Sequence, residues 1–556
     1  MNIAEATASS IESAGPRKRT GAPTACGWAA SALVRGALWA LCLSLALRAG
    51  PVAAAEDEEE DEAKPAVSAP AAAKKAAVPV PKEASTASRH QVTISGADIG
   101  YTATAGNLVI RKGDDPVASM FYVAYTRDDV KDVEKRPVTF FYNGGPGSST
   151  LWLHMGSFGP RVVETANAQA TGPAPFRLSN NPDSLLDRSD LVFVDAVSTG
   201  FSKVVGKGKG KDFYGVDGDV DAFAKFITRY VTQNHRWNSP KFLFGESYGT
   251  LRSCALAYRL QQQGLSFNGI ILLSTVMDYS ALVSPVLDQP IEDILPTYAA
   301  IAYYHDKLPR KPADLQAFLQ EVRDYAAGEY AQALSKGQYL PDAQRDAVAA
   351  RLHEYTGLSV GFIKEANLRV GPGRFRKELL RDEGRTVGRY DGRFEGIDFD
   401  AAGETATYDA SEAGIKGAFT AAFNNYLVGE LNYTHDTPYQ VSSTEFSVKD
   451  WDFHHKLPEY MNFPLPYPFA FVINDLGQAM RENPHLKVLS ANGLFDLATP
   501  FFGTERCLNH MGLDPSLRGN LTFAYYPSGH MVYLNPEAHK AFKADLAKFY
   551  DSATQP

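Results

Sequence analysis

The pentapeptide Gly245-Glu-Ser-Tyr-Gly249 constrains the fold of this chain more than any other segment. The apolar segment Lys241-Phe-Leu-Phe244 directly before it is typical of a buried strand, and a helix is predicted from Ser247 to about Gln263. A sharp turn between a strand and a helix lifts a serine Oγ clear of the backbone, and flanking glycines leave room for that turn. The alternative is a serine that merely begins a helix. In this context we predict that Ser247 is a nucleophile.

Apolar strands and helices alternate on both sides of this turn. Strands are predicted at 137–142, 191–194, 241–244, 269–273, 487–490 and 521–525, and helices at 217–231 and 536–550. Such alternation predicts a parallel sheet with helices on both faces. Before it, residues 94–125 alternate apolar and polar side chains with glycine-containing breaks, which predicts short antiparallel strands.

The alternation stops between residues 281 and 465, where the sequence is first helical and rich in tyrosine and then polar. We therefore predict an α/β-hydrolase fold, with a mostly parallel central sheet, helices on both faces and an inserted helical and irregular lid. The core is expected at residues 90–280 and 466–556, with the lid at 281–465. The lid would lie over the C-terminal edge of the sheet, where ligands bind in open α/β folds.

The first 55 residues have the order of a secretory signal peptide. Arg17-Lys-Arg19 precedes an apolar stretch that is densest at Ala37–Leu47, and Ala53-Ala-Ala55 offers small residues for cleavage. We expect removal of residues 1–55 and a periplasmic or secreted protein. The alternative is an uncleaved membrane anchor, for which the apolar stretch is short. Residues 56–89, which begin with seven acidic residues, are predicted to be a disordered linker rich in Ala and Pro.

The overall charge is −9 at pH 7, which argues against nucleic acid as the main partner. Aspartates and histidines gather at 450–455, but they lack the spacing of metal ligands, so we predict no metal and no cofactor. After cleavage no stable membrane association is expected, and the oligomeric state stays open. Only Cys254 and Cys507 would remain in the mature chain, either paired or as two free thiols.

The acid and the base that a serine nucleophile needs should follow it in the order carboxylate, then histidine. Asp496 comes after the predicted strand at 487–490, and His530 comes after the one at 521–525. His530 would accept the serine proton, and Asp496 would orient the imidazole and stabilise its charged form. The alternatives are a loop histidine and a turn aspartate without a catalytic role. Because all three residues follow strand ends in the expected order, we predict that they form a catalytic triad.

The tetrahedral intermediate of acyl transfer needs two fixed N–H donors. One is expected from Tyr248, the residue after the nucleophile. The other is expected from the glycine-rich segment Asn143-Gly-Gly-Pro-Gly147, which follows a predicted strand. An ordinary glycine turn is the alternative.

Four sequence blocks, which follow one another along the chain, carry a family resemblance. They are Tyr142-Asn-Gly-Gly-Pro-Gly-Ser-Ser149, Leu191-Val-Phe-Val-Asp-Ala-Val-Ser-Thr-Gly-Phe-Ser202, Phe244-Gly-Glu-Ser-Tyr-Gly249 and Ser528-Gly-His-Met531. Together they resemble the serine carboxypeptidase family, peptidase family S10, and its bacterial members most. The resemblance spans roughly residues 95–550 apart from a divergent lid. It implies an enzyme that acts on the C-termini of peptides or proteins.

The resemblance also implies roles for individual residues. Gly145 and Tyr248 would give the oxyanion N–H donors, while Asn143, Gly144 and Glu246 would bind the free C-terminal carboxylate of a peptide. Glu246 can donate a hydrogen bond only when it is protonated, which would favour acidic conditions.

Three departures from the family are visible. A second glutamate, expected shortly before the Gly-Pro of the next loop, is replaced by Ser157, and the tryptophan usual before the oxyanion loop is replaced by Phe141 or Tyr142. The family's several disulfides are absent. These changes affect the expected acid preference and the recognition of the C-terminal residue, whereas the three catalytic residues are retained.

The sequence therefore predicts a serine-type carboxypeptidase that acts through an acyl-enzyme. An esterase or acyltransferase that uses the same triad is the main alternative, and a binding protein with an inactive site is a third. Arg252 is expected in an ion pair on a helix surface, and His154 either lines the cleft or packs in the core.

Overall fold

A computed structural model describes residues 78–280, 287–462 and 465–555 of the chain. The chain divides into two units, residues 1–74 and 75–556, and every described residue belongs to the second. The predicted signal peptide and the predicted linker up to residue 77 lie outside the described residues.

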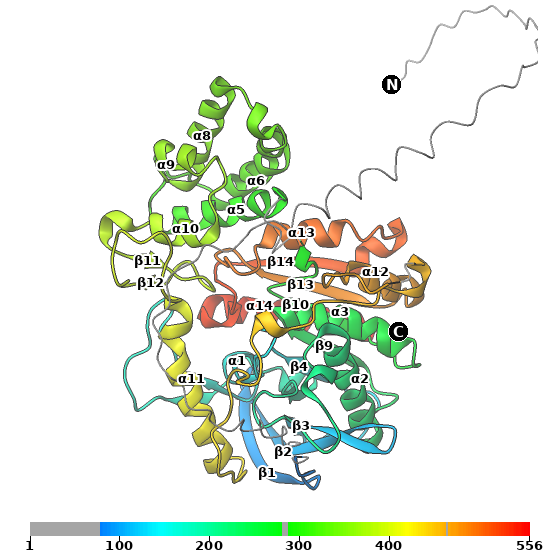
Figure 1. The fold of residues 1–556 in the computed structure, drawn as a ribbon. Coiled ribbons are helices and arrows are strands. Elements are labelled where there is room, and N and C mark those ends of the chain that lie inside the picture. Colours follow the sequence, from blue (N-terminus) through cyan, green and yellow to red (C-terminus); the bar gives the residue numbers. More distant parts are fainter. Residues whose placement is uncertain (1–77, 281–286, 463–464, 556) are drawn as a thin grey trace, which may run out of the picture. The chain divides into compact units, whose positions relative to one another are not determined.

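A ten-stranded sheet runs through this unit in the order β1-β2-β3-β7-β4-β9-β10-β13-β14, with β8 paired to β3 (Figure 1). Its strands are β1 (Ser85–Ile94), β2 (Ala97–Lys112), β3 (Asp115–Arg127), β4 (Val138–Tyr142), β7 (Asp190–Val194), β8 (Lys203–Val204), β9 (Lys241–Glu246), β10 (Gly269–Leu273), β13 (Lys487–Gly493) and β14 (Leu521–Tyr526). From β7 to β14 all neighbours are parallel, whereas β1, β2 and β3 join the sheet as antiparallel strands. The parallel part agrees closely with the strands predicted from the sequence.

Helices cover both faces of this sheet, and its central strands are therefore buried at every position. One face packs against α2 (Val216–Gln233), α3 (Tyr248–Gln261) and α12 (Ile473–Glu482), and the other against α1 (Leu151–Gly156) and α14 (Pro536–Thr554). Neighbouring side chains of β4 point to opposite faces of the sheet. Phe140 packs on the face covered by α2, α3 and α12, and Phe141 packs on the face covered by α1 and α14. The predicted α/β-hydrolase fold is confirmed. No helix of the described residues is long and apolar enough to cross a membrane.

The strands before this core differ from the prediction. β2 and β3 are long strands, because Gly100 and Gly106 of β2 continue the ladder and do not break it. β1 begins at Ser85, inside the predicted linker 56–89, and pairs with β2 along its whole length. Its polar sequence resembles a linker, but one side of an edge strand can stay in solvent while backbone pairing holds it.

The region between β10 and β13 contains a group of helices with an apolar cluster of its own. These helices are α5 (Gln289–Tyr304), α6 (Leu315–Tyr325), α7 (Ala331–Leu334), α8 (Asp342–Thr356), α9 (Val360–Glu365) and α10 (Pro372–Glu378). Their cluster continues into the core through α13 (Phe501–Asn509).

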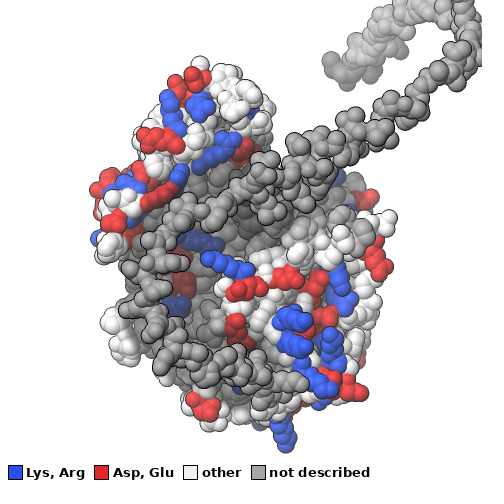
Figure 2. Space-filling view, viewed as in Figure 1, with Lys and Arg blue, Asp and Glu red and all other residues white. Residues whose placement is uncertain are grey.

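On the face in Figure 2, acidic and basic side chains are interspersed over the described residues. We keep 281–465 as a proposed boundary for the insertion.

One long helix and two short strand pairs complete the part that lies near the site. The long helix α11 (Ala410–Gly429) packs on α1, and Trp152 of α1 contacts Phe419 of α11 with ring centroids 5.2 Å apart. Two short antiparallel pairs flank it, formed by β5 (Arg161–Val163) with β6 (Leu178–Asn180) and by β11 (Thr386–Val387) with β12 (Glu395–Gly396).

The expectation that Arg252 forms a surface ion pair is wrong. The Arg252 side chain is 0% exposed, and its Nε and Nη2 atoms donate to the two carboxylate oxygens of Asp219 on α2, at 2.7 and 3.2 Å. Its Nη1 donates to the carbonyl of Asn143 at 2.8 Å, and the guanidinium lies 4.2 Å from the centre of the Phe223 ring. Aromatic and apolar side chains surround α3 here, so the position is interior although the residue is charged.

This buried pair predicts a large loss of stability when one partner is removed. Arg252→Met should lower the free energy of unfolding by about 3–5 kcal/mol, because it leaves the Asp219 carboxylate buried without its partner. Arg259→Met offers a matched control: it removes the exposed pair between Arg259 and Asp221, which joins the same two helices at 2.8 Å. That loss should stay below about 1 kcal/mol. Urea denaturation of both variants measures the difference, and equal losses would show that burial does not decide the importance of the Arg252 pair.

Candidate active site

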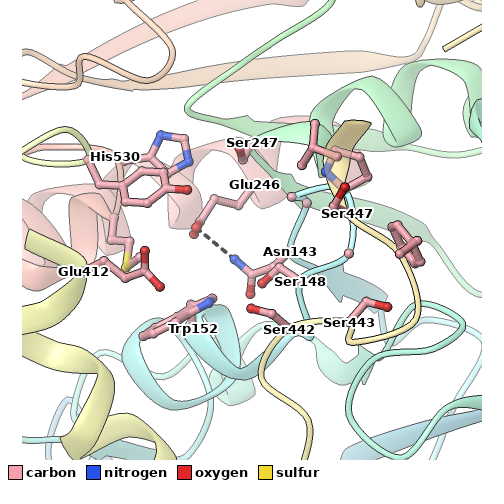
Figure 3. Close-up of a pocket in the computed structure, with 18 residues that line it drawn as sticks. Asn143, Ser148, Trp152, Glu246, Ser247, Glu412, Ser442, Ser443, Ser447 and His530 are labelled. Carbon is pink, nitrogen blue, oxygen red and sulfur yellow. Dashed lines mark hydrogen bonds between the residues drawn. The ribbon is translucent and has the colours of Figure 1, made fainter. Parts of the chain in front are cut away.

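Three parallel strands bring the predicted catalytic residues to one edge of the sheet. Ser247 follows β9, Asp496 lies just after β13, and His530 lies just after β14. β9, β10, β13 and β14 are adjacent and parallel, so their carboxyl ends meet at this edge. Ser247 and His530 both line a cavity of about 270 Å³ (Figure 3).

The turn at Ser247 has the strained geometry that the sequence predicts. Ser247 has a φ of 61°, in the left-handed region that non-glycine residues rarely adopt. The turn is so tight that a Cβ at Gly245 would lie 2.2 Å from the carbonyl oxygen of Gly249. Glycine at position 245 is therefore a steric requirement of the turn.

Asp496 and His530 form a buried hydrogen-bonded pair. The distance from His530 Nδ1 to Asp496 Oδ2 is 2.7 Å. The His530 side chain is 2% exposed and the Asp496 side chain is 1% exposed. Asp496 also accepts hydrogen bonds from the N–H groups of Ala498 and Thr499 and from the Thr499 hydroxyl. These bonds fix the carboxylate, and a carboxylate at Nδ1 requires the proton on that nitrogen, which leaves Nε2 as the acceptor.

The charges around His530 favour its protonated form. Burial disfavours the imidazolium, but the Asp496 carboxylate outweighs burial, and the pKa of His530 is raised above its usual value. This arrangement suits a base that must hold a proton between two steps of a reaction.

The glycine-rich loop lies directly against the turn of the nucleophile. A Cβ at Gly144 would stand 2.3 Å from the backbone nitrogen of Tyr248, so only glycine permits this approach. Tyr248 is the first residue of α3, and its N–H therefore has no acceptor within the helix. Gly145, with a φ of 104°, is the next residue of the loop and lines the same cavity.

Asn143 joins the loop to its surroundings through three hydrogen bonds. Its side chain donates to Glu246 Oε1 at 2.8 Å and accepts from the N–H of Leu153 at 2.9 Å, and its carbonyl accepts from Arg252 at 2.8 Å. The amide group of Asn143 is thus fixed with its N–H₂ toward the cavity, as Figure 3 shows.

Glu246 is a buried carboxyl group that forms no ion pair within the part of the chain that the structure describes. It is 2% exposed, and burial raises its pKa to about 7, although His530, Tyr533 and Asn143 act in the opposite direction. Its Oε2 atom is buried and has no hydrogen-bond partner among the described residues. The Tyr533 ring lies nearby, but its hydroxyl is also outside hydrogen-bond geometry. A buried oxygen of this kind is a candidate contact for a ligand.

The other side of the cavity comes from a segment that was not predicted to be part of the site. We call residues 439–448 the strap. Its backbone pairs with the oxyanion loop, through Ser443 N–H to the Gly147 carbonyl at 2.7 Å and Ser149 N–H to the Val441 carbonyl at 2.9 Å. Ser442, Ser443, Phe446, Ser447 and Val448 line the cavity. No motif marks this polar segment, and its place follows only from the path of the chain through the insertion.

Four further residues at the cavity were also missed as site residues. Trp152 belongs to α1, Tyr390 and Glu412 to the insertion, and Met531 follows His530. The Tyr390 ring lies 5.0 Å from the His530 ring, and the Tyr390 carbonyl accepts from the His530 N–H at 2.6 Å. Met531 could have been found from its block; the others carry no sequence signal of their own.

Several other candidate residues of the sequence lie away from the cavity. His154 is packed in the core, 4.3 Å from the Phe193 ring and bonded to the Tyr125 hydroxyl at 2.6 Å, and burial lowers its pKa to about 3. Ser157, at the position of the family's second glutamate, donates to the Leu153 carbonyl at 2.5 Å. Cys254 and Cys507 are free thiols.

The histidines at 450–455 do not converge on one point. His454 bonds to exposed Asp452, whereas His455 is buried between Asp217 and Asp475, at 2.8 and 3.2 Å. These two carboxylates raise the pKa of His455 to about 9 against the effect of burial. Within the described residues, no three acidic, histidine or cysteine side chains form a group that could hold a metal ion.

The family model for serine carboxypeptidases matches residues 100–306 of the chain. No curated protein matches the chain. Solved structures that match include a prohormone-processing carboxypeptidase, Kex1(delta)p of Saccharomyces cerevisiae, which is 15% identical with a TM-score of 0.48 over 81% of this chain and 91% of that one. The proline iminopeptidase of Mycobacterium smegmatis is 14% identical with a TM-score of 0.34, over 81% and 98% of the two chains. These structural likenesses are too weak to assign an activity.

The matched range holds the first three of the four blocks, with the oxyanion loop and the turn of Ser247. The fourth block, Ser528-Gly-His-Met531, lies beyond it and reaches the same cavity through β14. Over residues 100–306 the chain is thus similar to the serine carboxypeptidase family.

Proposed function

We propose that this serine hydrolase removes C-terminal residues from peptides through an acyl-enzyme, with Ser247, His530 and Asp496 as its catalytic triad. The observation that carries the proposal is the pair Asn143 and Glu246, which lies in the same cavity as Ser247 and leaves one buried carboxyl oxygen without a partner. A free peptide carboxylate is the ligand that such a pair fits.

In the acylation step, Ser247 Oγ attacks the last peptide carbonyl while His530 Nε2 takes the hydroxyl proton. The N–H groups of Gly145 and Tyr248 stabilise the oxyanion of the tetrahedral intermediate. The C–N bond then breaks, and His530 gives its proton to the departing amine. In the second step, water attacks the ester carbonyl with the same base, and the shortened peptide leaves.

The carboxylate site explains why cleavage would stop at the last residue. Protonated Glu246 can donate from Oε2 to one oxygen of the substrate carboxylate, and the Asn143 amide and Gly144 contribute donors beside it. A chain whose carboxylate is bound there ends one residue beyond the attacked carbonyl. The strap narrows the same cavity from the other side, which supports an enzyme that acts at chain ends.

An esterase or acyltransferase could use the same triad, and it would not need the carboxylate pair. The retention of both Asn143 and Glu246 therefore favours the peptidase. We also keep the proposals that residues 1–55 direct secretion and that the mature protein is periplasmic or secreted.

The nucleophile is tested by Ser247→Ala. The variant should lose labelling by a fluorophosphonate probe and lose turnover by several orders of magnitude, because it removes the proposed nucleophile. Ser443→Ala, which removes another serine of the same cavity, is the matched control and should still be labelled. Circular dichroism checks that both variants are folded. Full labelling of Ser247→Ala would remove Ser247 from the mechanism.

The carboxylate site is tested by comparing a blocked dipeptide with its C-terminal amide. The free acid should react far faster, and Asn143→Ala should reduce this preference by about 1.5–3 kcal/mol, the value of a hydrogen bond to a charged group. The ratio of the two kcat/KM values is the measurement, because general damage to the site affects both substrates. If wild-type enzyme hydrolyses acid and amide equally well, the carboxylate-binding roles of Asn143 and Glu246 are wrong. An esterase or acyltransferase then becomes the favoured function.

The raised pKa of Glu246 predicts how substrate binding depends on pH. Below about pH 7 the Glu246 carboxyl is protonated and donates to the substrate carboxylate; above it, the ionised group repels that carboxylate. The KM for a free-acid dipeptide should therefore rise as the pH passes through about 7. Glu246→Gln keeps an N–H donor at every pH, so its KM should not show this rise. The same KM profile in both enzymes would disprove the role of Glu246.

A further inference from the structure

The cavity has two ends, and they differ in chemistry. At one end lie the oxyanion loop and the strap, with Phe446 and several serines. At the other end lie Trp152, Tyr390, Glu412 and Met531, which we call the outer subsite. Figure 3 shows the Glu412 carboxylate directed into the cavity beside Trp152, on the side of Glu246 that faces away from Ser443 and Ser447.

The proposed reaction assigns these two ends to the two parts of a peptide. His530 must protonate the departing amine, so the departing residue lies on the His530 side of the attacked carbonyl. Met531 follows His530 in the chain, and the Tyr390 ring is 5.0 Å from its imidazole. Burial raises the pKa of the Tyr390 phenol, and the nearby Glu412 charge acts in the same direction while Arg389 opposes it. The outer subsite therefore faces the side chain of the residue that is removed.

The backbone of Glu412 is firmly held. It lies in the first turn of α11, where the Asp409 side chain caps the helix by accepting from the Ser411 N–H. α11 packs on α1 through Phe419 against Trp152 and through Phe423 against the His154 ring, at 5.2 and 5.0 Å. The backbone of Glu412 is thus held in a fixed position beside the indole ring of Trp152.

The Glu412 side chain remains free to take a substrate partner. Its partner in the structure is Lys416, at 3.1 Å on the next turn, and the side chains of Glu412 and Lys416 are 36% and 50% exposed. Exposed pairs of this kind contribute less than about 1 kcal/mol, so a cation held by the rest of the substrate can replace Lys416.

We propose that Glu412 is a specificity-determining residue that favours substrates whose C-terminal residue is lysine or arginine. The inference rests on the proposed carboxypeptidase activity and names its preferred substrate class. Trp152 and Met531 would contact the aliphatic part of the side chain, and the indole face suits a cation as well. The Glu412 carboxylate would then pair with the positive charge at the end of the substrate side chain.

Two cations lie near this end of the cavity and oppose the preference. They are Lys416, which pairs with Glu412, and exposed Arg389, whose guanidinium lies 5.0 Å from the centre of the Tyr390 ring. If they outweighed Glu412, the subsite would select acidic residues. The experiment distinguishes these outcomes.

The test compares two blocked dipeptides that differ only in their last residue, lysine or norleucine. Norleucine matches the lysine stem without its charge, so the ratio of the kcat/KM values isolates the ammonium group. Wild-type enzyme should prefer lysine, and Glu412→Gln should reduce the ratio by about three- to tenfold. Lys416→Met, which removes the competing cation, should raise the ratio.

Glu430→Gln is the matched control, because it neutralises a glutamate at the far end of the same helix, where it pairs with Arg161 at 2.9 Å. It should leave the ratio unchanged. A ratio that Glu412→Gln does not alter, or a wild-type preference for norleucine over lysine, would overturn the inference while leaving the carboxypeptidase in place. If wild-type enzyme cleaves neither dipeptide, the proposed function itself fails.

Discussion

The hydrogen bonds of Asn143 join parts of the molecule that are far apart in the sequence. Arg252 in α3 fixes the carbonyl of Asn143, Leu153 in α1 fixes its side-chain oxygen, and the remaining N–H₂ donates to Glu246 beside the nucleophile. Gly144 lies against Tyr248 with no room for a side chain, so the loop and the turn of Ser247 are packed directly on each other. The glycine-rich loop, Ser247 and the proposed carboxylate site are thus joined by direct contacts.

The region between β10 and β13 bonds directly to the loops that carry Asp496 and His530. The carbonyl of Tyr390 accepts from the His530 N–H at 2.6 Å, and the carbonyl of Arg389 accepts from the Leu497 N–H at 3.1 Å, next to Asp496. The strap pairs with the oxyanion loop on the opposite side. Through these hydrogen bonds, the region between β10 and β13 helps to position the proposed acid, base and nucleophile.

The sequence predicted the central sheet because its strands are buried on both faces and read as short apolar runs. It also placed Ser247, Asp496 and His530 at one edge, since the carboxyl ends of parallel strands meet there. It failed where tertiary contacts override local pattern. Arg252 is charged yet buried, because Asp219 and the Asn143 carbonyl satisfy its guanidinium. The polar start of β1 and residue Glu412 have no local signal, because their roles come from distant partners in space.

The central claim is that the enzyme shortens chains from a free C-terminus. The most direct measurement incubates the full chain with a defined mixture of peptides, each present as the free acid and as the C-terminal amide, and follows the products by mass spectrometry. We predict free-acid peptides that lose residues one at a time from the C-terminus, while the amides and all internal bonds stay intact. Internal cleavage, or intact peptides in a preparation that hydrolyses simple esters, would contradict the claim.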